Sequence, residues 1–351
     1  MRVLVVDDSP VACMLLCAIL ESAGIDSRIA ESGEQALDIL DSYTPDIVTM
    51  DVNMPGMDGY ATTARILQKH ALPVVVLTAS AQVADAAIRA LEAGALAVIQ
   101  KPAGPEAPDF DQRVDELLRT LRVMSQVKIV RRSSTADRMP STVSKRPPPE
   151  STDIPKIVGI AASAGGPAAL KTLLQRLNPA QPWPILLVQH IAAGFIDSFR
   201  EWLERIAPIP VKVAEANQPL ERGVLYLAPD DCSIGVTCRN HVQLESCRPE
   251  QLICPSADHL FHSMAKALGQ SAIGIQLSGM GRDGASGLLD LKNHGALTLV
   301  QQPSDAVIDS MPRTAIDMHA ACEVLPAEQI ADMLNTLARQ YLNDNRPRQG
   351  R

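Results

Sequence analysis

The stretch Ile157-Val-Gly-Ile-Ala-Ala-Ser-Ala-Gly-Gly-Pro-Ala-Ala-Leu170 begins with an apolar run, passes through a turn of small residues and continues with a helical pattern. A short, continuous apolar run is typical of a strand that is buried on both faces of a parallel sheet. A strand, a tight turn and a helix in this order predict an α/β domain, whose functional residues lie at the carboxyl ends of the strands.

The same alternation continues towards the C-terminus. Further strands are predicted at Ile185–Gln189, Ser271–Leu277 and Leu297–Gln301. Residues 211–247 carry shorter alternating runs that are interrupted by turn residues, which favours hairpins on the rim of the domain. We therefore predict that residues 156–345 form an α/β domain.

Residues 123–155, which precede this domain, have a different composition. They include five prolines, nine serines or threonines, and six basic against three acidic residues. Such a segment buries too little apolar surface to offset the entropy of ordering it, so we predict a flexible linker. Docking of its basic residues on a partner is the alternative.

Residues 1–122, before the linker, repeat the α/β pattern. Short apolar runs predict buried strands at Val3–Val6, Ile47–Met50, Val74–Leu77 and Ala97–Ile99. Helical spacing between them predicts helices at Val11–Ser22, Ser32–Asp41, Tyr60–His70 and Val83–Ala93. Repeated β-α units predict a doubly wound sheet, so we expect two α/β domains with mainly parallel sheets.

Three acidic residues stand at strand ends in the first domain. Asp7 and Asp8 follow the first strand and Asp51 ends the third, so a parallel sheet brings their carboxylates to one edge. Their mutual repulsion favours a bound cation, and hard oxygen ligands favour Mg²⁺. Asp51 is then a candidate nucleophile towards phosphorus, and Thr78 and Lys101, at later strand ends, are candidate ligands of phosphate oxygens. For any one acidic pair, the alternative is an ordinary turn at a strand end.

Several segments of the first domain form a recognisable set: Val-Val-Asp-Asp-Ser-Pro (5–10), Met-Asp-Val-Asn-Met-Pro-Gly-Met-Asp-Gly (50–59), Leu-Thr-Ala-Ser (77–80) and Gln-Lys-Pro (100–102). They resemble the response-regulator receiver domains, which implies a flavodoxin-like fold with Asp51 as the phosphoacceptor. The resemblance also implies direct Mg²⁺ ligands, a ligand that acts through water, and a switch pair. The direct ligands are Asp8, Asp51 and the Asn53 backbone carbonyl, and Asp7 acts through water. Thr78 and Lys101 are the switch pair. A cis peptide bond between Lys101 and Pro102 is implied as well.

Three other residues occupy strand ends in the second domain. Ser163 lies in the turn after the first strand, His190 directly follows the second, and Asp283 lies in a glycine-bounded turn after a third. Together they have the chemistry of a nucleophile, its general base and a carboxylate that orients the base. Two alternatives for the serine turn remain open. Gly165-Gly166 at a helix start can cradle a phosphate, or the small residues allow close packing of strand on helix.

Five segments of the second domain form another set: Ala-Ser-Ala-Gly-Gly-Pro (162–167), Gln-His-Ile (189–191), Cys-Pro-Ser-Ala-Asp-His-Leu-Phe-His-Ser (254–263), Leu-Ser-Gly-Met-Gly-Arg-Asp-Gly-Ala-Ser-Gly-Leu (277–288) and Ser-Met-Pro (310–312). They resemble the catalytic domain of the CheB-type protein-glutamate methylesterases over residues 156–326. The resemblance implies Ser163 as the nucleophile, His190 as the base and Asp283 as its orienting group, without a cofactor in this domain. It further implies that the backbone amides of Met280 and Ala164 stabilise the oxyanion.

The sequence departs from the usual pattern of that family at several positions. Ala161 and Ala164 replace a glycine and a threonine near the nucleophile, Ser233 replaces a histidine, and Asp309-Ser310 replaces Tyr-Gly. The three candidate catalytic residues are retained, so these changes bear on substrate fit and rate.

The composition argues against several other classes of protein. A hydrophobic content of 46% with 21% charged residues is typical of a folded soluble protein, and the net charge of -8 argues against nucleic acid as the main partner. The N-terminus reaches two carboxylates too early for a signal peptide, and no apolar run approaches the ~20 residues that cross a bilayer. The seven cysteines lack a paired C-x-x-C spacing and are expected to be reduced thiols. His259 and His262 lack a third ligand at useful spacing, so packing is expected there.

The two resemblances together imply a phosphorylation-activated hydrolase of sensory adaptation. It is expected to demethylate glutamyl methyl esters, and to deamidate glutamines, on methyl-accepting chemotaxis receptors, with a chemotaxis-type histidine kinase as the phosphodonor. The second family also implies that the unphosphorylated receiver covers the catalytic cleft. We expect a cytoplasmic monomer without direct membrane insertion. The alternatives are a signalling adaptor with an inactive hydrolase domain and a nucleotide-binding regulator.

Overall fold

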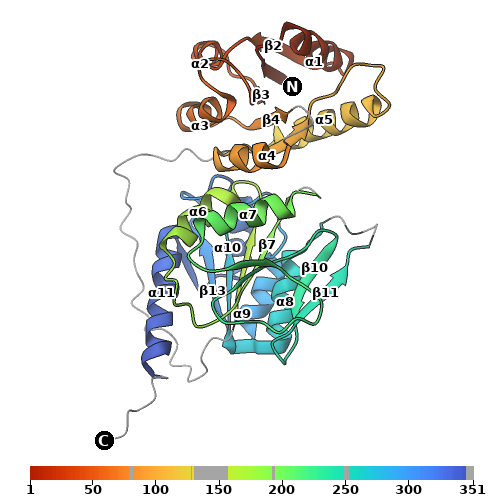
Figure 1. The fold of residues 1–351 in the computed structure, drawn as a ribbon. Helices are drawn as coiled ribbons and strands as arrows, with labels where there is room; N and C mark the ends of the chain where they lie inside the picture. The colour runs from red at the N-terminus through yellow and green to blue at the C-terminus, as the bar shows by residue number, and fades with distance from the viewer. Residues whose placement is uncertain are drawn as a thin grey trace, which may run out of the picture. The chain divides into compact units, whose positions relative to one another are not determined.

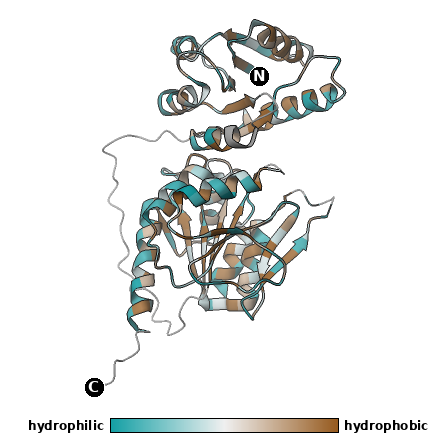
Figure 2. Ribbon diagram, viewed as in Figure 1, coloured by the Kyte–Doolittle hydropathy of each residue, from teal (hydrophilic) through white to brown (hydrophobic). Residues whose placement is uncertain are grey.

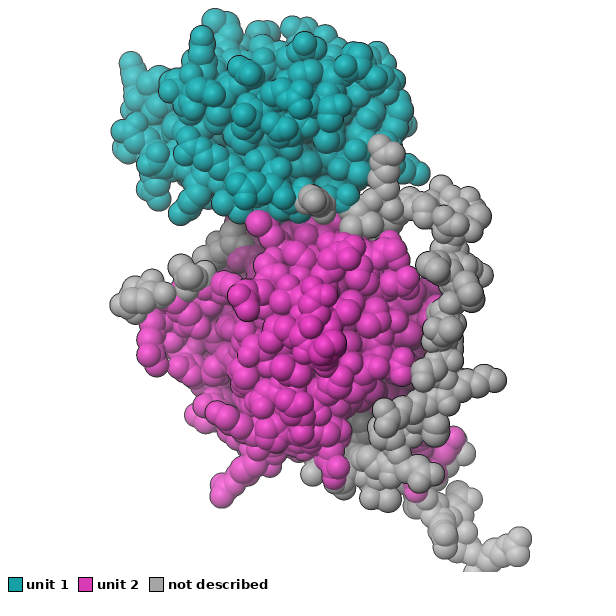
Figure 3. Space-filling view, turned by 180° about the vertical axis from the view of Figure 1, so that it is seen from behind, with its two compact units in different colours: residues 1–131 teal, residues 132–351 magenta. Residues whose placement is uncertain are grey.

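The computed structural model describes residues 1–78, 83–127, 129, 157–191, 194–248, 251 and 253–344. The chain divides into two compact units, residues 1–131 and residues 132–351, which Figure 3 shows in different colours. Each unit has its own main sheet and its own hydrophobic core. The linker predicted over 123–155 lies mostly outside the described residues, and helix α5 (Phe110–Met124) occupies its first two positions.

The first unit alternates strands with helices along the chain (Figure 1). Before α5, its elements are β1 (Arg2–Val6), α1 (Pro10–Ser22), β2 (Asp26–Ala30), α2 (Gly33–Leu40), β3 (Ile47–Asp51), α3 (Gly59–His70), β4 (Val74–Thr78), α4 (Val83–Glu92) and β5 (Ala97–Gln100). The strands are parallel, in the order β2-β1-β3-β4-β5. In this flavodoxin-like order the winding reverses between β1 and β3, which leaves a crevice at their carboxyl ends. The predicted doubly wound sheet is confirmed.

Alternate residues of each buried strand in this unit pack on opposite faces of the sheet. On β1, Leu4 and Val6 join residues of α2, α3 and α4, whereas Val3 and Val5 join residues of α1 and α5. Because both faces are covered, the central strands are continuous apolar runs, and their hydrophobic colour is visible in Figure 2. The edge strand β2 is mostly exposed and has no such run, so the sequence pattern does not identify it.

Short polar side chains define where the helices of this unit begin. The side chains of Ser9, Ser32 and Asp58 accept hydrogen bonds from backbone amides in the first turns of α1, α2 and α3. Capping of this kind satisfies amides that have no partner within the helix. Ser9 directly follows Asp8, and the loop after Asp51 ends at Asp58. Two of these helices therefore begin beside the acidic strand ends.

The second unit has the same alternation of strands and helices (Figure 1). Its elements are β6 (Ile157–Ala162), α6 (Gly166–Arg176), β7 (Ile185–Gln189), α7 (Ile196–Ile206), β8 (Val211–Val213), β9 (Leu225–Leu227), β10 (Cys232–Val236), β11 (Val242–Ser246), α8 (Ala257–Leu268), the 3-10 helix η1 (Gly269–Ser271), β12 (Ala272–Gln276), α9 (Ala285–Asn293), β13 (Leu297–Gln301), α10 (Ser310–Asp317), β14 (Glu323–Leu325) and α11 (Ala327–Asp344). Seven parallel strands form the main sheet in the order β14-β13-β12-β6-β7-β9-β8. The winding reverses between β6 and β12, so a crevice is expected beyond their carboxyl ends.

The prediction of rim hairpins over residues 211–247 is confirmed for the second half of this segment and wrong for the first. Strands β10 and β11 form an antiparallel pair in a separate sheet. Strands β8 and β9 instead pair in parallel and extend the main sheet through the contact of β9 with β7. These strands are three residues long, which is too short for periodicity to separate a hairpin from a sheet extension.

Helices cover both faces of the main sheet in the second unit. Buried residues of α8, α9 and α10 pack in one cluster with Ile157 and Ala161 of β6. Helix α6 contacts both α7 and α11, and these three helices cover the opposite face (Figure 1). Among the helices of the described residues, none is both long and apolar enough to cross a membrane.

The prediction of a cis peptide bond between Lys101 and Pro102 is wrong. Among the described residues, the cis bond is Cys254–Pro255. The trans form of an X-Pro bond is favoured by only about 0.5–1 kcal/mol. The surrounding loop therefore decides the isomer, and a three-residue motif is too short to specify it.

Candidate active site and phosphoacceptor pocket

Ser163 lies in the turn between β6 and α6. Its backbone amide donates to the carbonyl of Ser278 (3.0 Å), and its carbonyl accepts from the amide of Gly166 (2.8 Å). Gly165, with φ at 75°, takes the left-handed conformation that leads the chain into α6. The serine is 8% exposed and stands at the reversal point of the sheet, where functional residues of this architecture gather.

Close packing explains the small residues around this turn. A Cβ atom at Gly166 would lie 2.7 Å from Oε1 of Gln189 and 2.8 Å from Cβ of Ala162. A Cβ atom at Gly279 would lie 2.8 Å from Cβ of Ser163. The close-packing interpretation of the turn is therefore confirmed, and it applies to the glycines that surround the serine.

His190 follows β7, the neighbour of β6 in the sheet. Its backbone amide donates to the carbonyl of Ala162 (3.0 Å), so the backbone of the histidine lies beside the serine turn. Gln189 ties the two segments together, because its Nε2 donates to the carbonyls of Ser163 (2.9 Å) and His190 (3.0 Å). We did not identify Gln189 from the sequence, although a polar residue that ends an apolar strand is an available signal.

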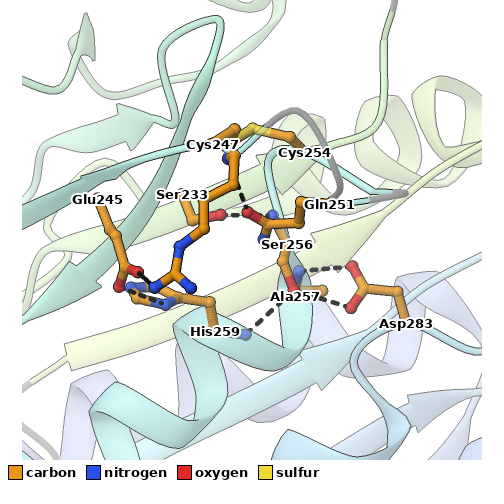
Figure 4. Close-up of a disulfide and its surroundings, with 10 residues drawn as sticks. Ser233, Glu245, Cys247, Gln251, Cys254, Ser256, Ala257, His259 and Asp283 are labelled. Atoms are coloured by element: carbon orange, nitrogen blue, oxygen red, sulfur yellow. Dashed lines mark hydrogen bonds and ion pairs between the residues drawn. A yellow bond between two sulfur atoms is a disulfide. The ribbon is translucent and has the colours of Figure 1, made fainter.

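Asp283 lies in the loop between β12 and α9 and faces the first turn of α8 (Figure 4). Its Oδ2 accepts from Nε2 of His190 (2.9 Å) and from the amide of Ala257 (2.6 Å). Its Oδ1 accepts from Oγ of Ser256 (3.0 Å) and from the amide of Asp258 (3.1 Å). The carboxylate is therefore held from both sides by groups that donate hydrogen bonds.

The surroundings of Asp283 favour its ionised form. Burial alone raises the pKa of a carboxyl group, and Asp283 is 6% exposed. The hydrogen bonds from His190 and from the amide of Ala257 outweigh burial and hold the pKa of Asp283 below its ordinary value. The positive end of the α8 dipole acts in the same direction. A carboxylate that is ionised at neutral pH is suited to stabilise an imidazolium beside it.

The histidine therefore has a defined orientation towards the acid. Its Nε2 is bonded to Asp283, which leaves Nδ1 as the ring nitrogen that is available to the serine. No hydrogen bond joins Ser163 to His190 in the described part of the chain. Catalytic hydrogen bonds are often long before a substrate binds and shorten in the reacting complex. Neighbouring strands deliver the two residues to one edge, and this is the arrangement that the sequence predicts.

Beside the serine turn, the backbone amides of Ala164, Gly165 and Met280 have no acceptor among the described residues. By contrast, the amides of Ser163, Gly279 and Gly281 all donate to protein oxygens. Unpaired amides next to a nucleophile are suited to an oxyanion, because they are in position before charge develops.

Ser310, which belongs to a departure from the usual family pattern, holds the turn that carries Met280. Its Oγ donates to the carbonyl of Gly279 (2.9 Å) and accepts from the amide of Gly281 (3.0 Å). The hydroxyl therefore fixes the backbone on both sides of Met280. This contact joins residues about thirty positions apart in the chain, so sequence proximity does not reveal it.

Cys247 and Cys254 form a disulfide that links the end of β11 to the loop before α8 (Figure 4). The expectation that the cysteines are all reduced thiols is therefore wrong for this pair. Their Cα atoms are 6.1 Å apart, within the range of a disulfide. Their separation of seven positions matches no signature motif, so only the fold reveals the pairing. The free cysteines are Cys13, Cys17, Cys232, Cys238 and Cys322.

In the first unit, Asp7, Asp8 and Asp51 meet at the reversal point between β1 and β3. Each offers an oxygen atom, and these atoms lie within 4.8 Å of one another. Nζ of Lys101, which follows β5, is 2.7 Å from Oδ2 of Asp7 and 2.7 Å from Oδ1 of Asp51. Clustered carboxylate oxygens fit a hard divalent cation such as Mg²⁺, and this is the one candidate metal cluster among the described residues.

The other predicted residues of this pocket lie at the same edge. Burial opposes the charge of Lys101, but its hydrogen bonds to Asp51 and Asp7 outweigh burial and raise its pKa. Lys101 therefore remains a cation that offsets the acidic cluster. Thr78, which is 4% exposed, ends β4 next to β3, and Asn53 lies on the loop two residues beyond Asp51.

Comparison with known proteins agrees with this division of the chain. Residues 158–334 match the family model described as CheB methylesterase, and residues 3–108 match the response regulator receiver domain. A protein from Hahella chejuensis named protein-glutamate methylesterase/protein-glutamine glutaminase 3 is 43% identical over 346 residues, which cover 96% of this chain and 98% of the relative. A protein from Syntrophus aciditrophicus with the same type of name is 42% identical, with 96% and 98% covered.

A solved structure gives a further comparison for the second unit. It is the CheB methylesterase catalytic domain of Thermotoga maritima, which is 31% identical and superposes with a TM-score of 0.50 over 52% of this chain and 98% of that chain. With two full-length relatives above 40% identity and a family model over half of the sequence, the chain belongs to the CheB methylesterase family and carries a response regulator receiver domain at its N-terminal end.

Proposed function

We propose that this protein is a phosphorylation-activated hydrolase that demethylates glutamyl methyl esters, and deamidates glutamines, on methyl-accepting chemotaxis receptors. The observation that carries the proposal is the 2.9 Å bond between Nε2 of His190 and the ionised Asp283 beside the Ser163 turn. The names of the full-length relatives support both activities. An adaptor with an inactive hydrolase domain is not favoured, because Ser163, His190 and Asp283 are all retained at one edge.

The reaction follows from the roles that these groups can fill. Oγ of Ser163 attacks the side-chain carbonyl carbon of the glutamyl ester while Nδ1 of His190 accepts its proton. The negative charge of Asp283 stabilises the imidazolium, which then returns the proton to the leaving methanol. Water attacks the acyl-enzyme with His190 again as the base, which frees Ser163 and leaves a glutamate carboxylate. With a glutamine substrate the same steps release ammonia.

The unpaired amides of Met280 and Ala164 are assigned to the oxyanion. They face no acceptor in the part of the chain that the structure describes, so a carbonyl oxygen that gains negative charge would find two donors without displacing bonds seen there. One such donor contributes about 2.7–4 kcal/mol of transition-state stabilisation in a serine hydrolase. The Ser310 contacts on either side of Met280 would hold this donor in place.

Control is assigned to the acidic pocket of the first unit, with Asp51 as the phosphoacceptor. Asp7, Asp8, Asp51 and the Asn53 carbonyl would hold Mg²⁺, which when bound neutralises the carboxylates and orients the phosphoryl oxygens. Lys101 already bonds to Asp51, so it can follow the charge to a phosphoryl oxygen, with Thr78 as the second switch residue. A chemotaxis-type histidine kinase is the proposed donor. These partners imply a cytoplasmic protein, and we propose that it acts as a monomer.

Replacing the phosphoacceptor tests this assignment. In the Asp51→Asn variant, a small phosphodonor should no longer stimulate methanol release from methylated receptor membranes, because the amide cannot form an acyl phosphate. Basal release should remain. The matched control is Asp46→Asn, which removes an exposed carboxylate at the other end of β3 and should leave stimulation intact. Unchanged stimulation in Asp51→Asn would contradict the assignment.

Removing the first unit tests the direction of control. Deletion of residues 1–123 should raise basal activity, by roughly 5- to 150-fold, the usual range of coupling between two sites. The reason is that the resemblance assigns the unphosphorylated receiver an inhibitory role. The second unit has its own core, so the truncated protein is expected to fold. A truncated enzyme that is clearly slower than the unphosphorylated full-length chain would argue against inhibition.

A further inference from the structure

The loop before α8 contains a serine that contacts the candidate catalytic acid directly. Oγ of Ser256 donates to Oδ1 of Asp283 (3.0 Å) and accepts from the amide of His259 (3.3 Å). The direction of the first bond is fixed by chemistry, since an ionised carboxylate only accepts and the amide of His259 only donates. The hydroxyl proton of Ser256 must therefore point at Asp283.

Ser256 is itself held in place from the other side. Its backbone amide donates to Oγ of Ser233 (3.1 Å), and Ser233 is 2% exposed on β10. Cys254, two residues earlier, is joined to Cys247 at the end of β11. The segment that leads into α8 is thus attached twice to the β10–β11 hairpin, as Figure 4 shows.

We infer that Ser256, held by Ser233, is a positioning residue for the hydrolase, which fixes the Asp283 carboxylate so that its other oxygen is aimed at His190. The contacts form one continuous line from Ser233 through Ser256 and Asp283 to the imidazole. Oδ1 carries the bond from Ser256 and Oδ2 carries the bond from His190, so a rotation of the carboxylate breaks both together. This inference rests on the proposed hydrolytic function.

Ser233 has a defined place in this line of contacts. Its small buried hydroxyl accepts from the Ser256 amide. Ser233 acts on the acid through Ser256 and does not contact Asp283 in the described hydrogen-bond network. Removal of the Ser233 hydroxyl should therefore lower kcat, as removal of the Ser256 hydroxyl does, but by a smaller factor.

The test uses the full-length chain with a phosphodonor and methylated receptor membranes, and measures methanol release. Ser256→Gly should lower kcat about tenfold, because a hydrogen bond to a charged group is lost, while KM stays within about twofold. Glycine is chosen because it replaces serine at a helix N-cap at little cost, so α8 should remain folded. Ser256→Thr, which keeps the hydroxyl, should stay within about twofold of the parent protein.

Two further variants separate positioning from general destabilisation. Ser263→Ala removes another hydroxyl from α8, one that bonds to Leu260 and Val236 and not to Asp283, and it should leave kcat unchanged. Ser233→Ala should lower kcat severalfold. The double variant with Ser256→Gly should lose less kcat than the product of the two single losses, because both residues act through one contact.

The outcomes separate this inference from the proposed function. If Ser256→Gly keeps kcat within twofold, or if Ser263→Ala loses as much as Ser256→Gly, the positioning role is wrong although the parent enzyme is active. If the parent protein releases no methanol and matches Ser163→Ala, the proposed function fails and takes this inference with it. A tenfold loss in kcat that threonine restores supports the inference.

Discussion

The Ser163→Ala variant is expected to release no measurable methanol from methylated receptor membranes. Loss of the nucleophile in a serine hydrolase lowers kcat by about 10⁶-fold, and the other two members of the catalytic set cannot compensate. The fold should be unaffected, because the described hydrogen bonds of Ser163 are all made by its backbone. The melting temperature should therefore stay within about 2 °C of the parent protein.

The control for this variant is Ser286→Ala. Ser286 is an exposed serine on α9 in the same unit, so the chemical change is identical but lies away from the turn. This control should retain full activity. Methanol release by Ser163→Ala at the rate of the parent protein would remove the nucleophile from the proposed mechanism.

The Asp283→Asn variant is expected to lose about 10⁴-fold in kcat, because a neutral amide no longer stabilises the His190 imidazolium. Stability should fall as well, by about 2 kcal/mol. The carboxylate accepts from four donors, whereas an amide places its NH₂ group against two of them. At least one backbone amide of α8 then faces a donor or loses its partner.

The structure provides a matched control for this variant in a second His–Asp pair. Nδ1 of His262 lies 2.9 Å from Oδ2 of Asp290, the same separation as in the His190–Asp283 pair. Asp290→Asn should therefore leave kcat unchanged. An equal loss of activity in both variants would show that any such pair supports the fold. It would contradict the catalytic role of Asp283.

The difference in unfolding free energy between the parent protein and Asp283→Asn should depend on pH. The pKa of Asp283 gives the direction of this dependence. This pKa is lowered in the folded protein from its ordinary value of 3.8. The carboxylate therefore stabilises the fold fully above pH 3.8, and this contribution is lost as the pH falls through the lower folded pKa. The gap in unfolding free energy between the parent and Asp283→Asn should shrink as the pH falls below 3.8. Denaturant unfolding at each pH measures it.

The central strands of both units could be predicted from the sequence because burial on both faces leaves continuous apolar runs. The same reasoning brought Asp7, Asp8 and Asp51 to one edge, and it brought Ser163 and His190 to another, since residues that follow parallel strands meet at their carboxyl ends. Strand β2 and the parallel pairing of β8 and β9 could not be predicted, because an exposed edge strand and three-residue strands carry no clear period.

The residues that support the site were missed for a different reason. Gln189, Ser256 and Ser310 act through hydrogen bonds of their side chains. These bonds join segments that lie far apart in the chain. The Cys247–Cys254 disulfide spans only seven positions, but its spacing matches no signature motif, so the sequence does not reveal it either. Contacts of this kind depend on how loops meet after folding; only Gln189, a polar residue at the end of an apolar strand, carries a local signal.

Two of the departures from the family pattern can be interpreted from the structure. Ala161 is fully buried on β6 in the cluster with α8, α9 and α10, so its methyl group adds to the core. Ala164 keeps the backbone amide assigned to the oxyanion and lacks only the hydroxyl and methyl groups of a threonine. Both changes leave the proposed chemistry intact.

The most direct test of the central claim is methanol release from methylated receptor membranes by the full-length protein, with and without a small phosphodonor. We expect release that depends on Ser163 and that rises when the phosphodonor is added. No methanol under either condition, from a protein that is folded and phosphorylated on Asp51, would contradict the assignment of Ser163, His190 and Asp283 as a hydrolytic centre.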